Sequence, residues 1–206
     1  MTKYIKSFFG FFTTFLIILS CSAQAGSVKN LFQNSNDPYS GNRHGKVTIV
    51  EFFDYQCSHC ITMAPVLSAI IKANPDVRVV YKEFPIRGDI SNFASRAALA
   101  ANKQGKYDQF HNALLKTNLD LTQQTILDIA STSGLNLAKL QKDMDSPSVY
   151  KQLSDNARIA QEKRITGTPA FFIGKTSAEN DNDVNFVLGE MSQSELQEAI
   201  DKTKKS

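Results

Sequence analysis

The sequence has few of the residues that build metal sites or long-range cross-links. Its 206 residues include only three cysteines and three histidines. A structural zinc site needs four ligands, and the histidines outside the cysteine pair, His44 and His111, show no ligand spacing, so no bound metal is expected. Basic residues (23) and acidic residues (20) nearly balance, and there is no basic stripe of the kind that binds nucleic acid. The composition therefore favours a globular domain with neither a metal nor a nucleic-acid partner.

Long apolar runs are also scarce, and the only one extends from about Phe8 to Leu19. It is about a dozen residues long, whereas a membrane-spanning helix needs roughly 20. Lys3 and Lys6 precede this run and small residues follow it. This layout is typical of a secretory signal peptide over residues 1–25, cleaved before Gly26. We therefore expect the mature chain to be exported to the periplasm as a soluble domain.

Cys21 offers an alternative route to the same compartment. The stretch Ile18-Leu19-Ser20-Cys21 resembles a bacterial lipoprotein cleavage box, although Leu19 is bulky for that motif. Lipid attached at Cys21 would tether the domain to a membrane without altering its fold. A lipid anchor at Cys21 is therefore kept as an alternative to free export.

Removal of the leader leaves two cysteines, which lie two residues apart in Cys57-Ser58-His59-Cys60. Such a pair cannot act as a long-range cross-link, because the stabilisation from closing a loop grows with loop length. The pair lies after an apolar run and before a helical pattern, which is the setting of a redox site. Half of a zinc site is the alternative.

The first part of the domain predicts a strand, a helix and a second strand. Val47–Phe53 is almost continuously apolar, as expected of a central strand buried on both faces. A helix follows the cysteines to about Ala73, with Pro65 expected to kink it. Val77–Phe84 predicts the second strand of a right-handed βαβ unit. Residues 26–45 are polar and are predicted to form an irregular lead-in.

The pattern then changes to helices, from about residue 91 to residue 163. Breaks at Gly105, Gly134 and Pro147 separate them. The segment is therefore predicted to be an inserted all-helical subdomain. The expected helices are Phe93–Ala101, Tyr107–Lys116, Thr122–Ser131, Leu137–Met144 and Ser148–Lys163.

Two short apolar runs near the C-terminus, Ala170–Ile173 and Val184–Leu188, predict an antiparallel hairpin. Ser192, followed three residues later by Glu195, predicts the start of a closing helix that ends near Lys202. We therefore expect one α/β domain with a helical insertion. Its parts are a signal peptide (1–25), an irregular lead-in (26–45), a first α/β part (46–90), a helical insertion (91–163) and a second α/β part (164–206).

Several motifs occur in an order that is specific to one family. They are Glu51-Phe52-Phe53, Cys57-Ser58-His59-Cys60, Pro65, an alanine-rich helix, and Thr168-Pro169 before a late strand. Together they resemble the DsbA family of exported thiol-disulfide oxidoreductases, which have a thioredoxin-like α/β fold with a helical insertion. The resemblance implies a cis Thr168–Pro169 bond and a role for Glu51 in moving the proton of Cys60. It also implies unfolded exported proteins as substrates, a membrane reoxidase of the DsbB type, and no cofactor besides the Cys57–Cys60 disulfide.

The residues themselves suggest separate roles for the two cysteines. Cys57 lies at the start of a helix, where free N–H groups and the helix dipole favour an anion, so it is the expected nucleophile. His59, when protonated, would further stabilise the thiolate. Cys60 is expected to be the less exposed thiol, which resolves the mixed disulfide. The alternatives are an ordinary exposed residue for His59 and a solvated strand-end carboxylate for Glu51.

Ser58, Thr168 and Pro169 are expected to face the substrate. A cis-proline would place the backbone of Thr168 beside Cys57, free to pair with an extended segment. Ser58 and Thr168 differ from the proline and valine of the best-known DsbA, which leaves the direction of electron flow open. A disulfide isomerase or reductase with the same dithiol is one alternative, although the short lead-in favours a monomer over a dimer. A non-enzymatic envelope-binding role is the other.

Overall fold

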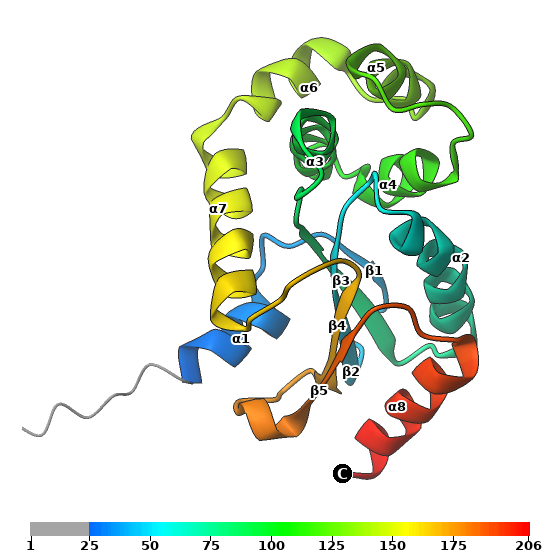
Figure 1. The fold of residues 1–206 in the computed structure, drawn as a ribbon, viewed down its shortest axis with the longest axis vertical. Coiled ribbons are helices and arrows are strands. Elements are labelled where there is room, and N and C mark those ends of the chain that lie inside the picture. Colours follow the sequence, from blue (N-terminus) through cyan, green and yellow to red (C-terminus); the bar gives the residue numbers. More distant parts are fainter. Residues whose placement is uncertain (1–24) are drawn as a thin grey trace, which may run out of the picture.

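The computed structural model describes residues 25–206, so Cys21 and the rest of the predicted leader up to residue 24 lie outside the described residues. Five strands form one mixed sheet in the order β1-β3-β2-β4-β5 (Figure 1). The central strand β2 is parallel to β3 and antiparallel to β4, and the edge strands β1 and β5 are antiparallel to their neighbours. The strands are β1 (Tyr39–Gly41), β2 (Val47–Phe53), β3 (Val77–Glu83), β4 (Ala170–Lys175) and β5 (Val184–Leu188).

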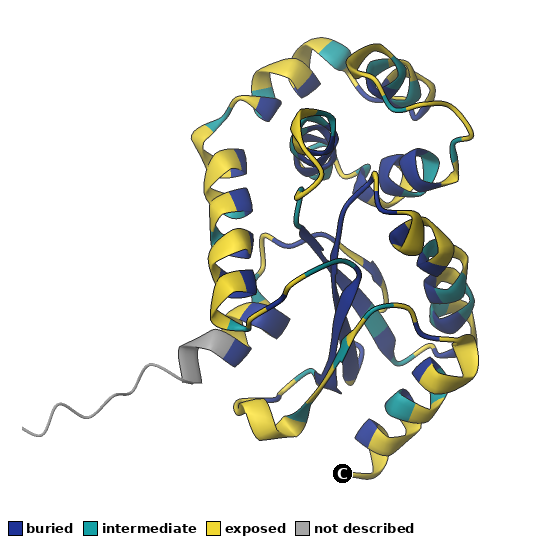
Figure 2. Cartoon of the chain, viewed as in Figure 1, coloured by how far each residue is buried: buried dark blue, intermediate teal, exposed yellow. Residues whose placement is uncertain are grey.

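Helices cover both faces of this sheet. Figure 1 shows α1 (Ala25–Gln33) and α7 (Pro147–Glu162) on one side, with α2 (Ser58–Ala73) and α8 (Gln193–Lys205) on the other. Because side chains alternate along a strand, β2 supplies both layers, and every one of its residues is buried. Figure 2 shows the central strands in dark blue between helices whose yellow residues lie on their outer surfaces, while the edge strand β5 is partly exposed. In the described part of the chain, no helix has the length and apolarity that crossing a membrane requires.

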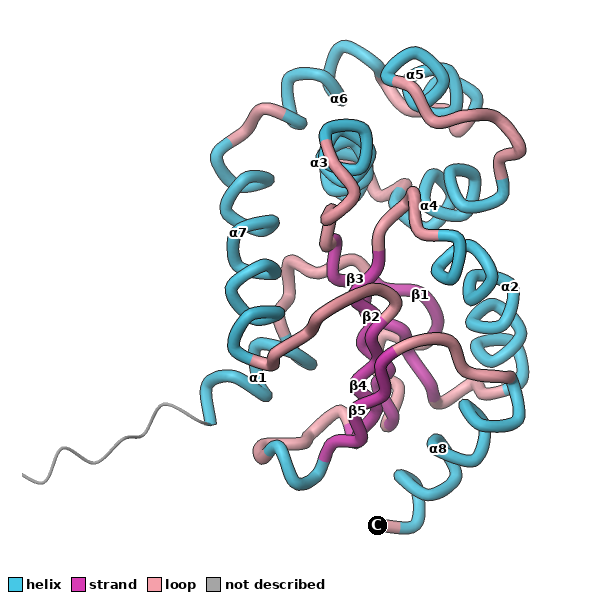
Figure 3. Tube along the Cα trace, viewed as in Figure 1, coloured by secondary structure: helices cyan, strands magenta, loops and turns pink. Residues whose placement is uncertain are grey.

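The five predicted helices of the insertion are present, and four of them gather beyond one end of the sheet (Figure 3). The first of them is rich in alanine, and its fully buried alanines let neighbouring helices approach closely. The last, α7, returns along the sheet, so the insertion shares its core with the α/β part. The remaining helices are α3 (Asp89–Asn102), α4 (Tyr107–Lys116), α5 (Gln123–Thr132) and α6 (Leu137–Met144).

The C-terminal elements follow the predicted pattern. Strands β4 and β5 form an antiparallel hairpin. The hydroxyl of Ser192 accepts from the Glu195 backbone N–H, and the Glu195 carboxylate accepts from the Ser192 backbone N–H. This capping box satisfies two N–H groups at the start of α8. Helix α2 runs through Pro65 to Ala73.

The prediction of an irregular lead-in over residues 26–45 was wrong, because this segment contains α1 and β1. Val28, Leu31 and Phe32 are spaced to form one apolar face of a helix, and all three are buried against the sheet. Tyr39 pairs with Val80 and extends the sheet at the edge of β3. The helical spacing of the three apolar residues is visible in the sequence but stands among mostly polar residues, whereas β1 depends on pairing with β3, which local sequence patterns do not reveal.

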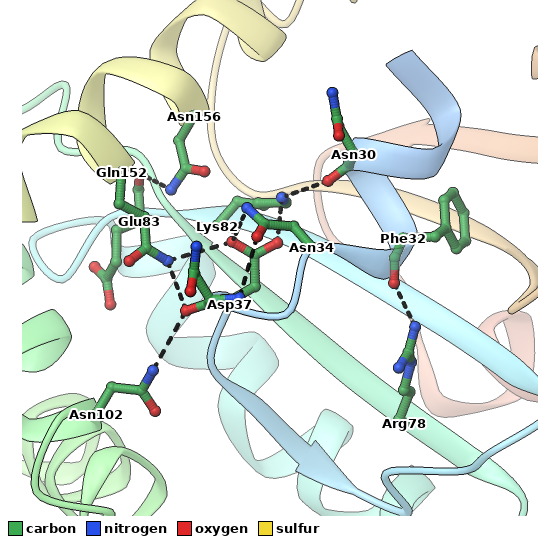
Figure 4. A network of polar contacts seen from close by, with 11 residues as sticks. Asn30, Phe32, Asn34, Asp37, Arg78, Lys82, Glu83, Asn102, Gln152 and Asn156 are labelled. Carbon is green, nitrogen blue, oxygen red and sulfur yellow. Dashed lines mark hydrogen bonds and ion pairs between the residues drawn. The ribbon is translucent and has the colours of Figure 1, made fainter. Parts of the chain in front are cut away.

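A buried ion pair fixes the lead-in to the rest of the fold (Figure 4). Lys82 of β3 pairs with Asp37, and their side chains are 0% and 1% exposed. Lys82 also donates to the backbone oxygen of Asn30 at 3.1 Å, and Gln152 of α7 donates to Asp37 at 3.3 Å. Burial raises the pKa of the Asp37 carboxyl, while the charge of Lys82 lowers it. Charges this deeply buried are tolerated only when they are paired and hydrogen-bonded.

Candidate active site

Cys57 and Cys60 lie at the junction between the end of β2 and the start of α2. Cys57 is the N-cap of α2, with extended backbone angles (φ −87°, ψ 112°), and its carbonyl accepts the first helical hydrogen bond from Ile61 at 3.0 Å. Both cysteines are free thiols. Both cysteines are buried, with Cys57 0% and Cys60 1% exposed, so the expectation that Cys60 is the less exposed thiol stays a prediction. The Thr168–Pro169 turn lies against Cys57, whose thiol donates to the Thr168 backbone oxygen at 3.2 Å.

The two thiols nevertheless differ in acidity. Burial raises the pKa of Cys57. Hydrogen bonds with Cys60 and Thr168 and the positive charge of Arg87 together lower this pKa by more than burial raises it, so the net pKa is lowered. Burial, the negative charge of Glu51 and the hydrogen bond to Cys57 all raise the pKa of Cys60 well above its usual range. A thiolate therefore forms at Cys57, while Cys60 keeps its proton. Cys57 is thus suited to act as the nucleophile, and Cys60 is suited to act as a leaving group that takes up a proton.

Glu51 lies on β2 beneath this pair and is 2% exposed. Its neighbours across the sheet are Tyr81 and Phe171. Burial first, then the negative charges of Cys57 and Glu83, raise the pKa of the Glu51 carboxyl to about 8. This carboxyl therefore holds a proton at neutral pH, close enough to both cysteines to affect their ionisation. The buried position contradicts a solvated strand-end carboxylate, and the proton-moving role stays a prediction.

We expect Glu51→Gln to raise the free energy of unfolding of the reduced protein at pH 7 by about 3 kcal/mol, because one pKa unit corresponds to about 1.4 kcal/mol. The folded-state pKa of Glu51 is raised from 4.5 to about 8, so folding takes up a proton between these values. The stability contributed by this carboxyl is fully present below pH 4.5 and is lost as the pH rises through 8. Urea unfolding at pH 7 and about pH 4 measures the difference. A gain of equal size at both pH values would contradict the prediction.

The remaining predicted residues occupy different positions around the thiols. His59 is 63% exposed, and its Nδ1 lies 2.7 Å from Oε1 of Glu190. It therefore forms an ion pair with Glu190 when protonated, and its effect on the Cys57 thiolate stays a prediction. Ser58 is exposed at the first position of α2. The Thr168–Pro169 peptide bond is cis, Pro169 is buried, and the turn lies against Cys57.

Asp54 is a residue whose importance the sequence did not reveal. It is completely buried and accepts hydrogen bonds from the backbone N–H groups of Gln56, Ile86 and Arg87 at 2.7 to 2.9 Å. It also accepts from the Ser91 hydroxyl at 2.6 Å. These bonds hold the segment after β3 beside the start of α2, and so place the Arg87 charge near Cys57. An aspartate just before the cysteine pair was the only sequence signal.

Three exposed apolar side chains lie on segments that adjoin the dithiol. Ile61 follows Cys60 on α2 and is 42% exposed, while Ile86 lies on the segment held by Asp54 and is 48% exposed. Leu188 ends β5 and is 49% exposed, next to Gly189, whose N–H donates to the Pro169 oxygen at 2.8 Å. Exposed apolar groups around a reactive centre favour binding of an apolar partner surface. Among residues 25–206, no cluster of three or more His, Cys, Asp or Glu side chains could hold a metal ion.

A Cys-x-x-Cys pair at a helix start, opposed by a cis-proline at the mouth of a mixed sheet, defines a dithiol protein of the thioredoxin-like class. Residues 48–201 match the family model described as the DSBA-like thioredoxin domain. The chain therefore belongs to this DsbA-like family and is a protein disulfide oxidoreductase.

Individual relatives agree with this assignment. The thiol:disulfide interchange protein DsbA of Bordetella parapertussis is 26% identical over 178 residues, which cover 79% of this chain and 84% of that protein. A thioredoxin-like oxidoreductase from Silicibacter pomeroyi is 40% identical, with a TM-score of 0.79 over 86% of this chain and 98% of that one. A periplasmic thioredoxin-like protein from Salmonella enterica serovar Typhimurium is 25% identical, with a TM-score of 0.76 over 87% of this chain and 97% of that one.

Two Salinispora proteins named Na(+)/H(+) antiporter NhaA are also similar, at 25% and 26% identity over 139 residues. The match covers 66% of this chain but only 21% of each of those proteins. The similarity is thus confined to a small part of their length.

Proposed function

We propose that this protein is an exported oxidase, which introduces disulfide bonds into unfolded periplasmic proteins. The observation that carries the proposal is the opposite shift of the two thiols, with a lowered pKa at Cys57 and a raised pKa at Cys60. A stabilised Cys57 thiolate favours the reduced protein, so the Cys57–Cys60 disulfide is readily passed on.

The reaction proceeds by two exchanges. A substrate thiolate attacks the Cys57 sulfur, the Cys57–Cys60 bond breaks, and Cys60 leaves with the electron pair and takes up a proton from Glu51. A second substrate thiolate then attacks the substrate sulfur of the mixed disulfide and releases Cys57 as a thiolate. The substrate loses two electrons and the protein gains them. The backbone of Thr168 would pair with the extended substrate, and the apolar side chains around the dithiol would bind it.

The predicted leader and the similarity to a periplasmic thioredoxin-like protein support a periplasmic setting. There, a membrane reoxidase of the DsbB type would restore the disulfide. We propose a monomer that is free in this compartment or tethered through lipid at Cys21. Mass spectrometry of the mature N-terminus distinguishes these two forms.

The decisive measurement is the reduction potential in glutathione buffers. We expect a value nearer to about −120 mV, as in DsbA, than to about −270 mV, as in thioredoxin. The wild type should also oxidise a reduced, unfolded protein, and Cys57→Ala is the matched inactive control. A potential close to that of thioredoxin would instead support the reductase or isomerase alternative, to which Thr168 and Ser58 point. An unchanged cellular phenotype of Cys57→Ala would support the non-enzymatic one.

A further inference from the structure

A second buried carboxyl lies behind the active site and is not used in the mechanism above. Glu83 ends β3 and is 0% exposed. Its Oε1 accepts hydrogen bonds from the hydroxyls of Tyr107 at 2.7 Å and Tyr55 at 3.1 Å. Its Oε2 is buried and makes no hydrogen bond among the described residues, and the Ser95 hydroxyl, which is likewise unpaired, lies close enough to lower the pKa of the carboxyl. A buried carboxylate would leave that oxygen uncompensated, whereas a protonated carboxyl has a hydrogen to donate from it.

Glu83 and Glu51 face the same side of the sheet. In the parallel pairing, Glu51 lies opposite Tyr81, and Glu83 lies opposite Phe53, so the two carboxyls are diagonal neighbours on adjacent strands. Burial raises the pKa of Glu83 to about 8, and the charge of Glu83 contributes to the raised pKa of Glu51. The two carboxyls therefore titrate as interacting groups in the same pH range.

A chain of hydrogen bonds leads from Glu83 toward solvent. The Tyr55 hydroxyl, which contacts Glu83, also lies 3.0 Å from Nδ1 of His111 on α4. Burial lowers the pKa of His111 to about 3, so the ring is neutral and one nitrogen donates while the other accepts. The bond to Tyr55 is the only hydrogen bond of this ring within residues 25–206. The ring also lines a cavity of about 140 Å³, whose wall includes the exposed side chains of Ser68 and Asp108.

We propose that Glu83 is a second proton-holding residue of this active site, which resupplies Glu51 and is connected through Tyr55 and His111 to the cavity beside α4. The proposal rests on the proposed role of Glu51. Glu83, Tyr55 and His111 do not touch the reacting sulfurs. They are positioning residues that act through Glu51 by controlling its proton.

Each residue that gives up a proton in this sequence of steps receives another one. When Cys60 leaves as a thiolate, it takes the proton of Glu51. Glu51 then takes one from Glu83 through one bridging water, because the two carboxyls are diagonal neighbours without a direct hydrogen bond. The Tyr55 hydroxyl gives its proton to Oε1 of Glu83, the Nδ1 proton of His111 replaces it, and Nε2 receives a proton from the cavity. One proton is taken from solvent for each Cys60 thiol formed. Reoxidation returns it by the reverse route.

Other groups around Glu83 also bear on its titration. The titratable groups near Glu83 come from three places. They are Glu51, Asp54 and Tyr55 on β2 and the turn after it, Tyr81 on β3, and Tyr107 and His111 on α4. Each of these is buried, and within this set only Tyr55 and Tyr107 donate hydrogen bonds to the Glu83 carboxyl. These two tyrosines therefore allow a matched comparison. Both donate to the same oxygen, but only Tyr55 also hydrogen-bonds to His111, whereas the Tyr107 ring stacks on the His111 ring with centroids 5.2 Å apart, a contact that phenylalanine would keep.

The test compares Tyr55→Phe with Tyr107→Phe. The Cys57–Cys60 disulfide is reduced by an excess of a cysteine-containing peptide in a stopped-flow instrument, from about pH 5 to pH 8, in H₂O and D₂O. We expect Tyr55→Phe and Glu83→Gln to slow the reaction at pH 7 by about tenfold, which is less than the 10²–10⁴-fold effect of a direct general acid. Both variants should also show a larger solvent isotope effect. Tyr107→Phe should stay within about twofold of the wild type, with an unchanged pH profile.

The outcomes distinguish the proposed role of Glu83 from the proposed role of Glu51. If the two tyrosine variants behave alike, Glu83 has only a structural role and the inference is overturned. If Glu51→Gln is slow while Tyr55→Phe and Glu83→Gln react normally, the inference fails and the role of Glu51 stands. If Glu51→Gln itself reacts normally, both fail, although the oxidase function is still decided by the reduction potential. Urea unfolding of each variant confirms that rates are compared between folded proteins.

Discussion

Cys60→Ser will accumulate a covalent mixed disulfide between Cys57 and substrate, whereas Cys57→Ser will form none and will lose all disulfide transfer. The lowered pKa of Cys57 makes it the reactive thiolate that attacks a disulfide-activated peptide. In the wild type, Cys60 can then attack Cys57 in the mixed disulfide, form the Cys57–Cys60 bond and release the peptide. Removing the resolving thiol therefore stops the reaction at the covalent stage.

Non-reducing gel electrophoresis and mass spectrometry of the protein mixed with a glutathione-activated cysteine peptide will detect this complex. The peptide mass should be found at Cys57 in Cys60→Ser and should be released by dithiothreitol. Ser154→Ala is a suitable control, because Ser154 is exposed on α7 and bears no thiol. Preferential labelling of Cys60 in the Cys57→Ser variant would show that the order of the two thiols is reversed.

Lys82→Met will lower the free energy of unfolding by about 3–5 kcal/mol, because it leaves a buried carboxylate without its partner. The side chains of Lys82 and Asp37 are 0% and 1% exposed, so water cannot replace the lost charge. Burial already raises the pKa of Asp37 against the opposing charge of Lys82. Asp37 will therefore take up a proton in the variant at higher pH than in the wild type, and the deficit will shrink as the pH falls.

Urea unfolding at pH 7 measures this effect, and two further variants interpret it. The double variant Lys82→Met/Asp37→Leu should recover most of the stability, since a buried ion pair can be replaced by apolar residues at little net cost. Lys151→Met removes one partner of the exposed pair with Asp155 on α7, and should change stability by less than about 1 kcal/mol. Equal losses in the free energy of unfolding for Lys82→Met and Lys151→Met would show that the buried pair contributes no more to stability than the exposed pair.

Local patterns in the sequence were sufficient for most elements of the fold. The apolar run Val47–Phe53 and the alternating run Val184–Leu188 coincide with β2 and β5. Ser192 and Glu195 form the predicted capping box. These features could be predicted because periodicity and capping depend on neighbours within a few residues. The dithiol could be predicted for the same reason, since its two cysteines are two residues apart.

The features that local patterns missed depend on residues far apart in the sequence. Lys82 and Asp37 are 45 residues apart, and His59 and Glu190 are 131 residues apart. The effect of Arg87 on Cys57 depends on the hydrogen bond from the Arg87 backbone N–H to Asp54, which the periodicity of the sequence does not predict. A charged residue within an apolar strand pattern, as at Lys82, was the available hint, because a buried charge requires a partner.

The contacts of the lead-in also determine when it can fold during synthesis. Its residues are the first of the described chain to be made, yet Asp37 needs Lys82 and Gln152, and the latter is 115 residues further along. Loop closure over such a span must precede the contact, so the entropic barrier is that of a non-local pairing. Helix α1 and strand β1 therefore dock only after most of the chain has emerged. Until then, the backbone and the apolar side chains of this segment are exposed to proteases and chaperones.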